Sequence, residues 1–129
     1  MRKALLVVAG GIALGGVAYA FYLLSAFGLA GECSDEIKTE APSADGAYKA
    51  AFFERNCGAT TNLASIVSVR RHDDRFDGDN DAAILVIDGR CAVDLAWSGC
   101  ALGVSYARPC TVVKRSTSWR DVTIRFSQL

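Results

Sequence analysis

Apolar residues alternate with polar or small ones along most of the chain after residue 46, which is the period of a strand with one buried face. Seven segments have strand character, at residues 48–55, 64–71, 82–87, 93–97, 102–106, 111–115 and 122–126. Turn-forming pairs such as Asp45-Gly46, Asp88-Gly89 and Ser98-Gly99 separate several of them. The pattern therefore predicts a mainly β domain, built as a small antiparallel β-sandwich or a partly open barrel of about seven strands.

Two of these segments carry more detailed predictions. Residues 82–87 (AAILVI) are continuously apolar, which is typical of a central strand covered on both faces. Residues 93–106 predict a hairpin with its turn at Ser98-Gly99, one apolar face and one face of small or polar residues. The intervening segment 72–81 is strongly charged, so we expect an exposed loop there.

Before the β-segments, Ala4–Ala30 form a run of 27 residues without a charge. About 20 apolar helical residues cross a bilayer core, so this run predicts a transmembrane helix with some tilt. Arg2 and Lys3 precede it and acidic residues follow, which places the N-terminus in the cytoplasm. We therefore expect a single-pass protein of the inner or plasma membrane: residues 1–30 as cytoplasmic tip and anchor in membrane lipid, 31–45 as a lead-in linker, and 46–129 as an extracytoplasmic domain.

A cleaved signal peptide is the alternative to a retained anchor. Ala18-Tyr19-Ala20 matches the small-x-small cleavage pattern, and Gly28-Leu29-Ala30 matches it loosely. Cleavage at the first position would leave an apolar new terminus, and cleavage at the second would require an apolar core about twice the usual length. The anchor is favoured over the signal peptide, and a buried helix of a soluble protein is the least favoured reading. Both of the first two readings export the remainder of the chain.

Small residues on the predicted helix suggest a route to self-association. Gly11 and Gly15 form a GxxxG motif, which lets two membrane helices approach closely. Glycine and alanine are also common in membrane helices generally, so helix-mediated dimerisation is the less favoured reading.

The charge balance argues against nucleic acid as a partner. Residues 31–129 contain 12 Lys and Arg against 14 Asp and Glu, a net charge of −2. A phosphate backbone is held by a concentrated field of positive charge, and the sequence has none.

Five cysteines in the exported part predict two disulfides and one remaining thiol. Cys33 and Cys57 would tie the lead-in to the first predicted strand, while Cys91 and Cys110 lie at the same end of the predicted hairpin. Cys100 lies at the hairpin turn and is expected to be the free one. The cysteines have no CxxC spacing, the sequence has a single histidine, His72, and no group of cysteine and histidine has the spacing of a zinc site.

A thiol enzyme is the alternative reading of the cysteines. It would use Cys57 as a redox thiol or as a nucleophile with His72 as its base. His72 lies in the charged loop, where a histidine is most often solvated, and no third orienting group is recognisable. Thr60 and Thr61 are more plausibly backbone hydrogen-bonding residues. We therefore expect no catalytic residues.

The loop around Asp77 contains the sharpest ligand-like pattern. Asp77, Asp79 and Asp81 alternate, and Asp88 occupies the twelfth position of a calcium-loop spacing. Ala82 replaces the glycine of that loop, and the flanking segments have strand rather than helix character. A Ca²⁺ site formed by these four aspartates is therefore a secondary prediction, beside the simpler reading of a solvated acidic loop.

One stretch of the exported part resembles a known group of proteins. Asp35-Glu36-Ile37, Phe53-Glu54-Arg55 and above all Cys57-Gly58-Ala59-Thr60-Thr61 are similar to a family of small exported bacterial proteins of unknown function. Ala44 stands where the family usually has proline, and Cys91, Cys100 and Cys110 are additional. The resemblance implies an exported domain and no particular activity.

Together, the patterns predict a membrane-anchored, non-enzymatic binding or structural module of the bacterial envelope that meets an envelope protein partner. A thiol-based redox protein or hydrolase using Cys57, and a calcium-dependent binding module, are the alternatives.

Overall fold

A computed structural model describes residues 15–22, 33–58 and 62–129. The chain divides into two compact units, Met1–Glu32 and Cys33–Leu129. In the first unit, residues 15–22 are helical and their side chains are exposed. Most of the predicted anchor, including Gly11 of the GxxxG motif, lies outside the described residues. Among those described, no helix has the length and apolar character needed to cross a membrane.

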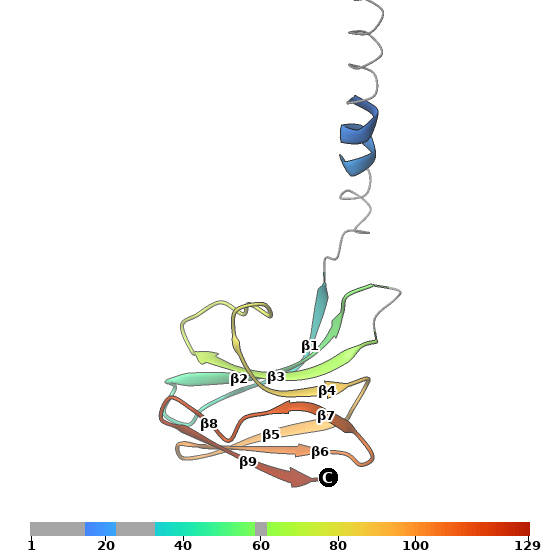
Figure 1. The fold of residues 1–129 in the computed structure, drawn as a ribbon. Helices are drawn as coiled ribbons and strands as arrows, with labels where there is room; N and C mark the ends of the chain where they lie inside the picture. Colours follow the sequence, from blue (N-terminus) through green and yellow to red (C-terminus); the bar gives the residue numbers. More distant parts are fainter. Residues whose placement is uncertain (1–14, 23–32, 59–61) are drawn as a thin grey trace, which may run out of the picture. The chain divides into compact units, whose positions relative to one another are not determined.

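The second unit is formed by β-strands in two layers (Figure 1). One sheet has the order β1-β2-β3-β4-β7 and the other has the order β5-β6-β9-β8. The strands are β1 (Ser34–Pro42), β2 (Tyr48–Asn56), β3 (Ala64–Arg71), β4 (Ala82–Asp88), β5 (Val93–Ser98), β6 (Ala101–Tyr106), β7 (Thr111–Arg115), β8 (Ser118–Trp119) and β9 (Val122–Gln128).

The mainly β prediction is confirmed, and each of the seven predicted segments is a strand with bounds that differ by at most two residues at either end. The strand pairs are antiparallel except one, since β6 and β9 run parallel. A parallel pair needs a crossover connection, and here the chain makes it by passing through β7 in the other sheet. The purely antiparallel arrangement expected from the sequence is therefore wrong at this one pair.

The prediction of a linker over residues 31–45 is corrected by β1. Its residues pair with β2 from Ser34↔Asn56 to Pro42↔Lys49. β1 is an edge strand with nearly every side chain exposed, so it lacks the apolar alternation by which a half-buried strand is recognised. Backbone pairing and side-chain ion pairs hold it instead. The tight turn expected at Asp45-Gly46 then leads into β2, with Gly46 at φ +73°.

The main core lies between the two sheets and follows the strand alternation. Trp97 on β5 also donates a hydrogen bond from Nε1 to the carbonyl oxygen of Ala41 on β1 (2.8 Å), which links the sheets at one side. The core residues are Ala50, Phe52, Val67, Val69, Ile84, Leu85, Ile87, Cys91, Val93, Leu102, Val104, Val122 and Ile124.

Strand β3 occupies the middle of its sheet and is buried on both faces. Val67 and Val69 face the core between the sheets, as the sequence predicts. Ile66, Ser68 and Arg70 alternate with them and are also buried. The segment predicted as the central strand, β4, lies inside the sheet between β3 and β7. The strand whose side chains are most completely buried is its neighbour β3.

Replacing Leu102 by alanine tests the position of the core. Leu102 has no exposed surface, so Leu102→Ala should lower the free energy of unfolding by about 2–5 kcal/mol. Leu129→Ala, at a leucine that is 58% exposed, is the matched control and should change it by less than about 0.5 kcal/mol. Urea unfolding of the full chain, followed by tryptophan fluorescence, measures both; equal losses would contradict the assigned core.

Candidate functional site

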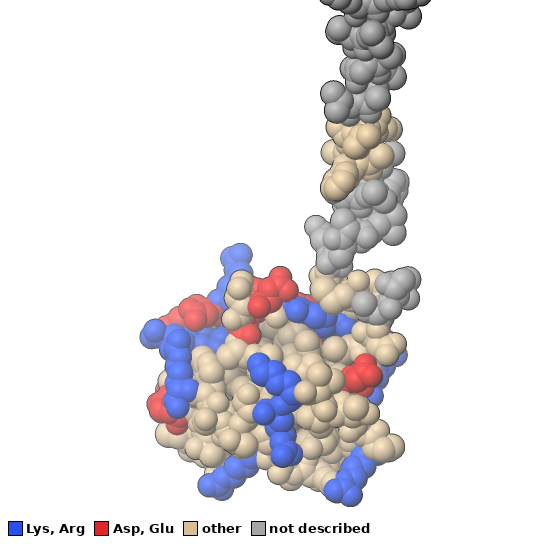
Figure 2. All heavy atoms as spheres, viewed as in Figure 1, with Lys and Arg blue, Asp and Glu red and all other residues tan. Residues whose placement is uncertain are grey.

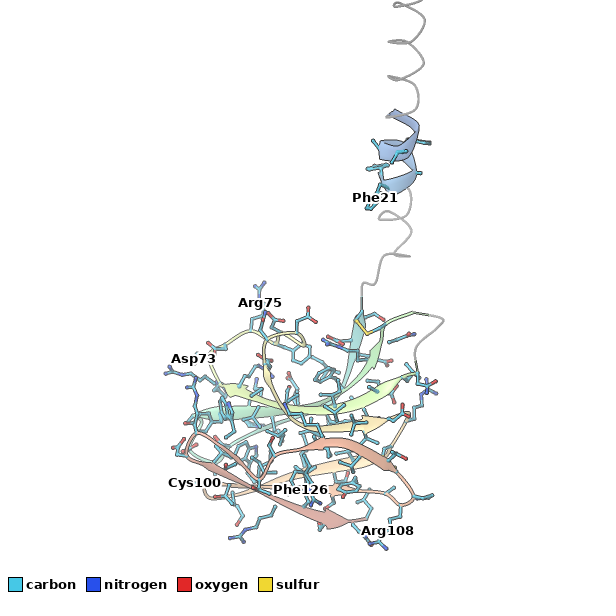
Figure 3. The ribbon with its side chains drawn as sticks, in the orientation of Figure 1. Phe21, Asp73, Arg75, Cys100, Arg108 and Phe126 are labelled. Carbon is cyan, nitrogen blue, oxygen red and sulfur yellow. A yellow bond between two sulfur atoms is a disulfide. The ribbon has the colours of Figure 1, made fainter. Side chains whose placement is uncertain are left out.

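The loop between β3 and β4 covers the outer face of the first sheet. Phe76, near its middle, packs edge-to-face against Phe53 of β2, with ring centroids 5.0 Å apart. The guanidinium of Arg70 lies over the Phe76 ring, 5.6 Å from its centroid. Figure 3 shows Asp73 and Arg75 on the outer side of this loop, pointing away from the sheet. The loop is thus exposed at its charged positions, as expected, and anchored by one aromatic residue.

Arg55 ties this loop to the edge of the sheet. Its guanidinium forms a two-bond pair with Asp35 of β1 (2.8 and 2.9 Å) and a further bond with Asp79 of the loop (2.9 Å). The hydrogen bond to Asp35 raises the pKa of Arg55. A Cβ at Gly78 would overlap the Asp35 carboxylate and Arg55 Nη2, so glycine is the residue that fits here.

Two acidic side chains of the loop, those of Asp77 and Asp81, accept hydrogen bonds within the loop itself. Asp77 accepts hydrogen bonds from the Nδ2 of Asn80 (2.7 Å) and from the backbone N–H groups of Asp79 and Asn80. The Asn80 side chain is the main cause that lowers the pKa of Asp77. Asp81 accepts a bond from the backbone N–H of Asp77 (3.0 Å). These contacts stabilise a compact turn.

The four aspartates of the calcium prediction therefore have different surroundings. Asp77 and Asp81 bond to the loop, Asp79 bonds to Arg55, and Asp88 ends β4 in an exposed position. Across residues 15–22, 33–58 and 62–129, no three acidic, histidine or cysteine side chains are grouped as metal ligands would be. Calcium binding stays a prediction.

Both expected disulfides are present in the structure. Cys33 is bonded to Cys57 and Cys91 to Cys110, with Cα–Cα distances of 4.0 and 6.1 Å. Cys100 is free and exposed, and Figure 3 shows it near the end of the second sheet. Cys57 in this state is not a free thiol. His72 is half-exposed on the loop, with Asp73 as its neighbour at 3.8 Å, and Thr60 and Thr61 lie outside the described residues.

A small cavity lies between this loop, the end of β3 and the turn from β8 to β9. Its volume is about 190 Å³. No pattern in the sequence predicts this cavity, and its only local signal is the pair of adjacent basic and aromatic positions Arg70-Arg71 and Trp119-Arg120. The residues that line it are Val69, Arg70, Arg71, Asp74, Asn80, Asp81, Ala82, Trp119 and Arg120.

Tyr48 supports the wall of this cavity from β2. Its ring contacts Trp119 edge-to-face, with centroids 5.4 Å apart. Its hydroxyl donates a short hydrogen bond to the carboxylate of Asp121. That hydrogen bond is the main cause that raises the pKa of Tyr48. The contact fixes the β8–β9 turn against the first sheet.

Charges of both signs lie on one face of the β-domain (Figure 2). On the face seen in Figure 2, basic and acidic side chains are interspersed over the β-domain. This agrees with the near-neutral composition, which offers no strong field to a polyanion.

The chain was compared with protein families, curated proteins and solved structures. No protein-family profile, curated protein or solved structure matches the chain.

Removing the Arg55 guanidinium should loosen the loop. In Arg55→Gln, Asp35 and Asp79 lose their charged partner. Trypsin should cut after Arg75 about tenfold faster, since the loop loses its charge-assisted contact with β2. Arg90→Gln is the matched control, because the Arg90 side chain is 74% exposed and makes one 3.5 Å ion pair with Glu54. Mass spectrometry of the early fragments measures the cut. Unchanged cleavage in Arg55→Gln would show that the contacts of Arg55 do not hold the loop.

The calcium hypothesis predicts a thermal effect. Millimolar Ca²⁺ should raise the melting temperature of the full chain, since a ligand bound only by the folded state stabilises it. Asp77→Asn should abolish the rise, and Asp73→Asn, at a fully exposed carboxylate, should retain it. No rise over a chelator-treated sample would eliminate the site.

Proposed function

We propose that this chain is an exported, non-enzymatic binding or structural module of the bacterial envelope, held at the membrane by residues 4–30. The observation that carries the proposal is the pair of disulfides inside a small β-domain. Disulfides persist in oxidising compartments and are rare in the cytosol. A 97-residue unit has a small core, so two such bonds are a substantial contribution to its stability.

The apolar run Ala4–Ala30 supports the membrane part of the proposal through its length and its flanking charges. The resemblance of the Cys57–Thr61 stretch to small exported bacterial proteins supports export. The alternative, a cleaved signal peptide, exports the same domain without the anchor.

Binding is favoured over thiol chemistry by the state of the cysteines. A thiolate is the reactive form, and Cys57 is bonded to Cys33. Cys100 is the free cysteine and lies exposed in the turn between β5 and β6. The arginine-lined cavity gives the domain a place to bind a small group.

Thiol mapping combined with topology mapping tests the proposal. The full chain is expressed in a bacterial host and alkylated before reduction; Cys100 should be the labelled cysteine, and Cys100→Ser should abolish labelling. Protease added to spheroplasts should reach the β-domain. After alkaline carbonate extraction, the protein should remain in the membrane pellet.

Each result bears on one part of the proposal. A β-domain protected from external protease would overturn export. Release by carbonate, with a mature N-terminus at residue 21 or 31, would replace the anchor by a signal peptide. Alkylation of Cys57 before reduction would favour the thiol-based alternative.

A further inference from the structure

The cavity at the end of β3 brings two neighbouring arginines, Arg70 and Arg71, together with Arg120, which is distant from them in sequence. Arg70 and Arg71 end β3, and Arg120 lies in the turn between β8 and β9. Guanidinium groups match the planar, two-oxygen geometry of a carboxylate. A volume of about 190 Å³ suits a small ligand or one end of a larger one.

Arg70 is held in place and still has an unused donor. Its side chain is 6% exposed, and it donates from Nη2 to Glu40 (2.8 Å) and from Nε to the carbonyl oxygen of Asp74 (3.2 Å). Its Nη1 is buried without a hydrogen-bond partner in the described part of the chain. An unpaired buried donor is unfavourable, and an acceptor that reached it would remove this cost.

Arg120 is held in an uncommon conformation beside the same cavity. Its φ is +54°, in the left-handed region that side chains other than glycine rarely adopt. Its guanidinium lies over the Trp119 ring, 4.9 Å from the centroid. Residues in such conformations concentrate at ligand sites, where the surrounding structure maintains them. Neither Arg71 nor Arg120 forms an ion pair with another described residue.

The acidic groups in the wall limit the charge that the cavity can accept. Asp74 and Asp81 also line it, and Asp81 already accepts the backbone N–H of Asp77. Nearby Asp121 accepts the Tyr48 hydroxyl hydrogen bond. Three guanidinium groups stand against two carboxylates in the wall, and Glu40 already pairs with one of the three, Arg70, so little positive charge is in excess. That balance favours a singly charged carboxylate over a doubly charged phosphate.

We propose that this cavity binds a carboxylate group, carried by a small organic acid or by the C-terminus of a peptide. The proposal deepens the binding role proposed above and rests on it. Arg70 Nη1, Arg71 and Arg120 are the donors, and the Trp119 ring holds the Arg120 guanidinium beside them.

Amide NMR titration of the full chain in a non-ionic detergent tests the proposal. Sodium acetate, at constant ionic strength against chloride, should shift the Asn80 and Arg120 amides saturably. The dissociation constant should be on the order of 1 mM, as expected for so small a ligand. An alanine tripeptide with a free C-terminus should bind more tightly than acetate if peptides are the source, and its C-terminal amide should not bind.

Two substitutions separate the site from general charge effects. Arg120→Gly removes the guanidinium and supplies a residue that adopts φ +54° without strain, so the fold should persist while acetate binding weakens at least about fivefold. Arg125→Gln, on the exposed side of β9, removes the same charge and should leave binding unchanged.

The results that overturn the proposal are distinct. Linear, non-saturating shifts, equal loss in both variants, or tighter binding of phosphate than of acetate at equal ionic strength would each reject a carboxylate site. Thiol and topology mapping are independent of these titrations. A failure here with export intact would therefore reject the ligand and leave the proposed envelope module standing.

Discussion

The double-sided burial of β3 is the constraint on which the rest of the domain depends. The strand is at the middle of its sheet, and its Ser65–Arg70 stretch is buried throughout. The second sheet covers the face that carries Val67 and Val69. The other face carries Ser68 and Arg70. Whatever covers this face must therefore also provide hydrogen-bond acceptors for a buried guanidinium group. The β3–β4 loop supplies this cover, with Phe76 as its apolar contact.

Two arginines make that polar cover stable. Arg55 joins β1 and the loop through Asp35 and Asp79, and Arg70 joins β3 to Glu40 and to the loop backbone. Both ion pairs use carboxylates of β1, namely Asp35 and Glu40. The segment predicted as a linker therefore provides the acidic partners of these two arginines. Ion pairs of this kind are worth most where they are shielded from water, as Arg70 is. The arrangement also places Arg70 next to Arg71 at the cavity.

The accuracy of the sequence predictions follows the strength of local patterns. The β5–β6 hairpin and its apolar face were predictable, because Val93, Leu95 and Trp97 alternate with small or polar residues. The disulfide pairs were predictable from the ends of predicted strands. β1 was missed since an exposed edge strand needs no apolar face, and the parallel β6–β9 pair was missed since strand direction depends on the path between sheets. The cavity was not predictable, as its arginines come from segments that only folding brings together.

The sequence by itself determined the β content, the positions of seven strands, the turns at glycine and the pairing of four cysteines. These follow from periods of a few residues and from composition, which the chain carries before it folds. The tertiary structure decided which strand is central, what the acidic loop contacts, and which arginines line the cavity. In the loop, the carboxylate of Asp79 pairs with Arg55, which is 24 residues away in the sequence. Such pairings depend on the register of neighbouring strands and on the packing of the two sheets, and no local pattern specifies them.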